Sequence, residues 1–152
     1  MTIEKEKSKM AHERFRKFET NNFYPTSFGE ESHHVANEFC MVVRAGNHIY
    51  MRGQTGFDLE GNFHGIDNVI EQTENACRCI KKLLEEAGGK MTDVCKITTY
   101  LTDRSYRKDA YGVIAKHFKG VYPVSTGLVV NGLALPEMLV EIDVEAVISD
   151  EE

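Results

Sequence analysis

The sequence lacks the features that would place the chain in or across a membrane. None of its apolar runs approaches the roughly 20 residues that a membrane-spanning helix needs. Residues 1–9 are charged and contain no apolar stretch of the kind found in secretory signals. These absences predict a cytoplasmic protein without a membrane partner.

Cysteine is also scarce, and its spacing matches no disulfide framework. The four cysteines are Cys40, Cys77, Cys79 and Cys95. In a cytosolic protein of this length we expect reduced thiols, with Cys77 and Cys95 in the core. The adjacent pair His33 and His34 lacks the spacing of metal ligands, so the sequence predicts no metal site.

Positive charge is in deficit over the whole chain. Eighteen basic residues stand against 24 acidic ones, which gives a net charge of −6. Binding to nucleic acid depends largely on cations that contact phosphates. The balance therefore argues against nucleic acid as a partner and against ribonuclease activity.

With 152 residues the chain has the length of one domain. Residues 1–37 are interpreted as an N-terminal arm, a surface helix or a loosely ordered segment followed by a loop, and residues 38–150 as the folded domain. Periodicity and turn signals predict two helices, from Asp67 to about Ala87 and from Asp103 to about Phe118. They predict strands over residues 39–43, 49–52, 94–102, 125–130 and 138–148.

This order, β-β-α-β-α-β-β, indicates an α+β fold with two helices packed on one face of a sheet. Apolar and charged residues alternate along the last strand, so that Glu141 projects from the face without helices. Arg52 projects from the same face of the second strand. This half-polar face is either exposed to solvent, as in many antiparallel sheets, or covered by another subunit.

The order and spacing of several motifs resemble those of the RidA (YjgF) family. The motifs that carry the resemblance are Ile49–Gln54, Gln72-Thr73, Leu84–Gly88, Asp93–Thr98, Tyr100–Asp103, Pro123 and Leu139–Ile148. The resemblance spans roughly residues 38–148. It implies a chorismate-mutase-like fold and a homotrimer with ligand sites in the clefts between subunits. It further implies hydrolysis of reactive enamines and imines to 2-keto acids, without a metal or organic cofactor.

Only part of the family's pocket is present at the corresponding positions. Glu141 corresponds to the glutamate that orients water, and Gly53 to the glycine of the pocket turn. The remaining positions are changed: Arg52 replaces a serine, Phe39 a tyrosine, Ser125 the substrate-binding arginine, Gly127 a frequent cysteine and Tyr111 an asparagine. The resemblance therefore identifies a divergent subgroup.

Two functions are compatible with this pattern. In the first, Glu141 orients or deprotonates water and Arg52 binds the carboxylate of a small enamine or imine, with hydroxyls from Ser125 and Thr126. We expect an adjacent Arg52 to keep Glu141 ionised, which suits a base rather than an acid. In the second, the chain is a non-catalytic trimer that binds a metabolite or another protein. Arg52 has an alternative role of its own, as the partner of Glu141 or another acidic side chain in a structural ion pair.

Overall fold

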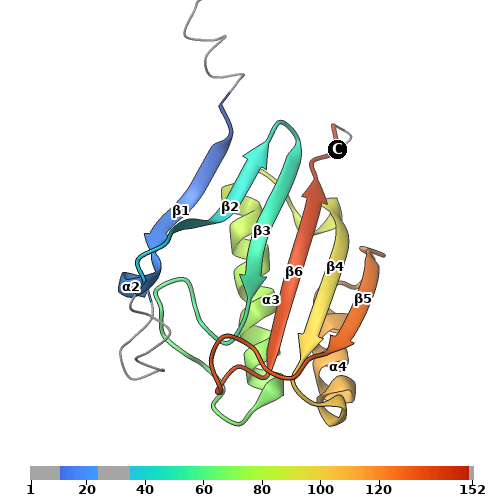
Figure 1. Cartoon of the computed structure of the whole chain (residues 1–152). Coiled ribbons are helices and arrows are strands. Elements are labelled where there is room, and N and C mark those ends of the chain that lie inside the picture. The colour runs from blue at the N-terminus through green and yellow to red at the C-terminus, as the bar shows by residue number, and fades with distance from the viewer. Residues whose placement is uncertain (1–10, 24–34, 151–152) are drawn as a thin grey trace, which may run out of the picture.

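The structure, a computed structural model, describes residues 11–23 and 35–150. It confirms the expected α+β fold, with two long helices packed on one face of a six-stranded sheet (Figure 1). In chain order the elements are β1 (Glu13–Glu19), α2 (Thr20–Phe23), β2 (Glu38–Ala45), β3 (His48–Gln54), α3 (Val69–Glu86), η2 (Met91–Asp93), β4 (Val94–Leu101), η3 (Arg104–Tyr106), α4 (Arg107–His117), β5 (Val124–Val129) and β6 (Val140–Val147).

The strand order places the last strand of the chain inside the sheet. Neighbouring strands follow the order β1-β2-β3-β6-β4-β5. Only the pair β4 and β5 is parallel, and the other pairs are antiparallel. The two edges are thus β1 and β5, and every residue of β5 is exposed.

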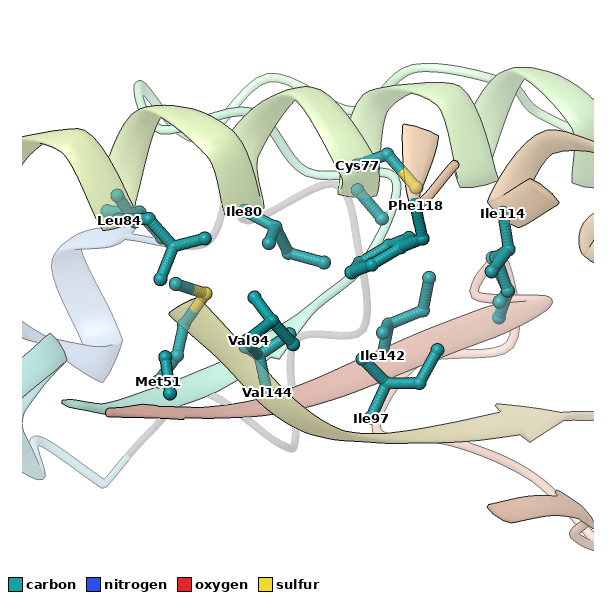
Figure 2. Packing of buried hydrophobic residues seen from close by; sticks show 14 of the residues in the cluster. Met51, Cys77, Ile80, Leu84, Val94, Ile97, Ile114, Phe118, Ile142 and Val144 are labelled. Carbon is teal, nitrogen blue, oxygen red and sulfur yellow. The ribbon is translucent and has the colours of Figure 1, made fainter. Parts of the chain in front are cut away.

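The core lies between the sheet and the two long helices. Along β6 the buried residues alternate with charged ones, as predicted: Val140, Ile142, Val144 and Ala146 face the helices. Leu84, Ile80 and Cys77 of α3 point toward these strands, and Phe118 fills the space beside them (Figure 2). Burial of this apolar surface stabilises the fold by on the order of 25 cal/mol per Å². Because the helices cover this face, the opposite face of the sheet remains available for a site.

The N-terminal segment differs from expectation. Residues 13–19 form a strand rather than a surface helix or a loosely ordered arm, and Phe15 and Phe18 pack against the core. Arg16 has a φ of 56° and forms two hydrogen bonds with Glu86 of α3, at 2.9 and 2.7 Å. Residues 1–10, 24–34 and 151–152, which include the histidine pair at positions 33 and 34, lie outside the described residues.

Two local predictions also need correction. The side chain that caps α3 belongs to Asn68, which accepts a hydrogen bond from the Glu71 amide at 3.1 Å, and not to Asp67. Cys95 is exposed rather than buried, since the pairing of β4 with β6 shifts register between Val94 and Lys96. A register shift of one residue turns a side chain to the other face of a strand.

Candidate functional site

The candidate site is built on a bulge in β3. Met51 pairs with Val144 of β6 and Gln54 pairs with Ile142. The two residues between them, Arg52 and Gly53, therefore lie opposite a single residue, Asp143. A bulge bends its strand and changes the direction of its side chains. Here it places Arg52 and Gly53 next to each other on the face without helices, where each is half-buried. The Gln54 side-chain amide donates to the Arg52 carbonyl at 2.8 Å and stabilises the bend.

Two carboxyl groups of β6 lie directly against Gly53. A Cβ added at Gly53 would lie 2.6 Å from Oε2 of Glu141 and 2.7 Å from Oδ1 of Asp143. Real Cβ atoms do not make contacts this short, so only glycine permits the approach. The predicted pair of Gly53 and Glu141 is therefore brought together, and Asp143 joins it.

The environment of Glu141 favours its protonated form. Burial raises the pKa of the Glu141 carboxyl above its ordinary value, and the Asp143 carboxylate raises it further. Arg52 lowers that pKa but has a smaller effect than either. The expectation that Arg52 keeps Glu141 ionised is therefore wrong, because the net effect of the surroundings is to raise the pKa of this carboxyl. Tyr100 donates a hydrogen bond to Oδ2 of Asp143 at 2.9 Å.

Arg52 extends toward the N-terminal strand. Its guanidinium carbon lies 5.0 Å from the ring centroid of Phe18 and 5.7 Å from that of Phe23. Both distances are typical of cation–π contacts. Arg52 also lines a hollow of about 1270 Å³ bounded by β1, α2, β2 and residues 59–60, and the exposed ring of Phe39 lies on its wall. Arg52 and Phe39, both predicted from the sequence, thus share one hollow.

The other predicted residues lie elsewhere in the protomer. Ser125 pairs with Ile97, whose side chain faces the helices, so Ser125 lies on the helix side of β5. Tyr111 lies on the same side, because its hydroxyl would touch a Cβ at Gly127. Thr126 projects from the face without helices, but at the far edge of the sheet from Arg52.

The structure adds residues that sequence reasoning missed. Phe18 and Phe23 contact Arg52 from an N-terminal segment that was not expected to join the sheet. Arg107, whose guanidinium carbon lies 4.5 Å from the Tyr111 ring centroid, was also missed. The spacing of Arg107 and Tyr111, four residues apart on a helix, was a signal that could have found this pair, since such residues share a helix face.

The described parts of the chain contain no group of three or more His, Cys, Asp or Glu side chains that could hold a metal ion. Among the helices of residues 11–23 and 35–150, none has the length and apolar character needed to cross a membrane.

Comparison with known proteins identifies the family. The profile of the family described as Endoribonuclease L-PSP matches residues 30–148. The chain belongs to this family. A RutC family protein of Pyrococcus abyssi is 29% identical to this L-PSP family chain over 116 residues, which cover 76% of the chain and 91% of the relative.

Solved structures agree with this assignment. RidA from an Antarctic Psychrobacter is 31% identical, with a TM-score of 0.67 and coverage of 72% of this chain and 88% of that one. A YjgF/YER057c/UK114 family member from Mycobacterium tuberculosis is 25% identical, with a TM-score of 0.68 and coverage of 91% and 100%. This L-PSP family chain is therefore a RidA-like protein with the chorismate-mutase-like fold.

Proposed function

We propose that this RidA-like protein hydrolyses a small enamine- or imine-type carboxylate to a keto acid and ammonia, in clefts between the subunits of a homotrimer. Glu141 handles the water, and Arg52 binds an anionic group of the substrate. The proposal rests on one observation above all, the half-buried Glu141 carboxyl that lies against the Gly53 backbone.

The chemistry of Glu141 supports this role. Hydrolysis of an imine needs a group that takes a proton from water and later returns one to the leaving amine. A carboxyl whose pKa is raised toward the working pH performs such transfers better than an ordinary exposed glutamate. Burial beside Asp143 provides that shift, and Gly53 leaves room for a substrate atom close to the strand.

The position of Arg52 supports the anion-binding role. Its guanidinium is flanked by Phe18 and Phe23 at the wall of the hollow, so its orientation is restricted before any ligand arrives. A restricted guanidinium loses less conformational freedom when it forms paired hydrogen bonds with a carboxylate. Phe39 provides an apolar surface beside it in place of the tyrosine hydroxyl of the family.

The alternative is a trimer that binds a metabolite or another protein without catalysis. The replacement of the family's arginine by Ser125 favours this alternative, because a main ligand for the substrate carboxylate is missing at that position.

Ammonia release from 2-aminoacrylate and from larger enamines, generated in the assay, distinguishes the two functions. We expect release by the wild-type protein and loss in Glu141→Gln, with Glu85→Gln, an exposed glutamate of α3, as the matched control. Ammonia release that is the same in Glu141→Gln as in the wild type would reject the catalytic proposal. Binding of the corresponding 2-keto acid without any ammonia release would favour the alternative.

A further inference from the structure

Tyr100 and Asp143 are linked on the face of the sheet without helices, beside Glu141. In the pairing of β4 with β6, Tyr100 lies directly opposite Glu141, and Thr98 lies opposite Asp143. The Tyr100 hydroxyl donates a hydrogen bond to Oδ2 of Asp143 at 2.9 Å. The Tyr100 side chain therefore reaches diagonally across the two strands, a distance that a long aromatic side chain can span.

This diagonal hydrogen bond draws the Asp143 carboxylate along the strand toward Glu141. Residues two apart on a strand share a face, and their Cα atoms lie about 6.6 Å apart. Even so, Oδ1 of Asp143 and Oε2 of Glu141 come within 2.7 and 2.6 Å of one point, the place where Gly53 lacks a Cβ. The two carboxyl groups thus converge over Gly53, and Tyr100 holds one of them in that position.

Two carboxyl groups in such proximity do not both ionise readily, because their like charges repel. An ionised carboxylate only accepts hydrogen bonds, and Asp143 accepts one from the Tyr100 hydroxyl. Glu141 is then the member of the pair that retains a proton. Burial raises the pKa of the Glu141 carboxyl, and the neighbouring Asp143 carboxylate raises it further.

The charged and titratable groups that face Glu141 come from the three strands around it. They are Asp143 of β6, which raises the pKa of Glu141, Arg52 of β3, which lowers it, and Tyr100 of β4. The hydrogen bond to Asp143 raises the pKa of the Tyr100 hydroxyl. Tyr100 therefore remains a donor throughout the pH range in which Glu141 changes its charge.

We propose that Tyr100 and Asp143 are positioning residues for Glu141: Tyr100 fixes Asp143, and Asp143 keeps a proton on Glu141. This inference deepens the proposed function and rests on it, since Glu141 is the group that handles the water. A Glu141 that holds its proton at the working pH can give it to the leaving amine, and the carboxylate that remains can take a proton from water. Neither Tyr100 nor Asp143 needs to touch the substrate.

NMR titration of the Glu141 side-chain carboxyl carbon tests the pair without requiring any activity, and the resonance is identified by its absence in Glu141→Gln. We expect Asp143→Asn to lower the midpoint of this titration by about one pH unit, because a neutral amide does not oppose ionisation of Glu141. Tyr100→Phe keeps the ring and should lower the midpoint by less, since the released Asp143 carboxylate can turn away.

Glu145→Gln is the matched control for Asp143→Asn. Glu145 lies on the same face of β6 and is exposed, but its Cα is about 13 Å from that of Glu141, beyond the range of strong interaction in salt. The control should move the midpoint by less than about 0.2 pH unit. An unchanged midpoint in a folded Asp143→Asn variant would overturn the pair, and an unchanged midpoint in Tyr100→Phe would overturn the part assigned to Tyr100.

The ammonia assay gives a second readout, one that a purely structural role would not move. In Asp143→Asn the limb of the pH profile of kcat that depends on Glu141 should move to lower pH by a similar amount, while KM changes by less than about twofold. A lowered midpoint in a protein that releases no ammonia supports the carboxyl pair and rejects the enzyme. Ammonia release with the same pH profile in Asp143→Asn as in the wild type supports the enzyme and rejects the positioning role.

Discussion

At the scale of single residues, Gly53 determines how closely the carboxyl groups of Glu141 and Asp143 approach β3. In Gly53→Ala the new Cβ would displace both groups, since it would lie only 2.6 Å from Oε2 of Glu141 and 2.7 Å from Oδ1 of Asp143. We expect the proposed ammonia release to fall about 10- to 100-fold, the usual effect of moving a reacting group by about 1 Å.

The stability of Gly53→Ala should change by less than about 1 kcal/mol, because the displaced atoms are the ends of flexible side chains on a half-exposed face. Gly112→Ala is a suitable control, since a Cβ there meets nothing within 4 Å. Unchanged kinetics in Gly53→Ala would show that the close contact has no part in the reaction.

The raised pKa of Glu141 makes a prediction about stability and pH. A carboxyl whose pKa is higher in the folded than in the unfolded protein stabilises the fold while protonated, and this contribution is lost as the pH rises through the folded pKa. At pH 7 Glu141→Gln should therefore unfold at a higher temperature than the wild type. The difference should vanish below about pH 4, near the ordinary pKa of glutamate. A Glu141→Gln variant that unfolds at a lower temperature than the wild type at pH 7 would contradict the shift.

Alternation along a strand was enough to place Arg52 and Glu141 on one face of the sheet, and a family motif was enough to single out Gly53. The direction in which Arg52 extends could not be predicted, because Phe18 and Phe23 reach it from a strand whose sequence gave little sign of pairing. The pKa of Glu141 was misjudged for a related reason. Burial depends on the whole surroundings, whereas sequence reasoning considered only the nearest cation.

At the scale of secondary-structure elements, the start of α3 is set by Asn68. Asn68→Ala removes the side-chain oxygen that accepts from the Glu71 amide, and we expect a loss of about 1 kcal/mol of stability. The melting temperature should fall by about 2–4 °C. Asp67→Asn serves as the control, since asparagine tolerates the positive φ of 55° at that position. A larger loss of stability in Asp67→Asn than in Asn68→Ala would indicate that Asp67 caps the helix.

Elements with regular apolar patterns were predicted within a few residues, as β4, α4 and β6 show. β1 was not, because five of its seven residues are charged and Arg16, with a positive φ of 56°, departs from the extended backbone of a regular strand. Its place in the sheet depends on pairing with β2 and on the Arg16–Glu86 contact, and both partners are distant in the sequence. The bulge that exposes Cys95 could not be predicted for the same reason, because it depends on how β4 pairs with β6.

At the scale of the whole molecule, the proposed function predicts a homotrimer with its ligand sites in clefts between the subunits. Light scattering should give three times the mass of one chain. A mass equal to that of one chain would contradict the proposed trimer.

The two edges of the sheet differ in a way that bears on solubility. β1 is rich in charge, which hinders the addition of another strand. β5 has neither a charged side chain nor a proline, and all six of its residues are exposed. An edge of this kind is a template for aggregation unless a neighbour covers it. We therefore expect protomers that are separated from one another to become turbid rather than to persist as monomers.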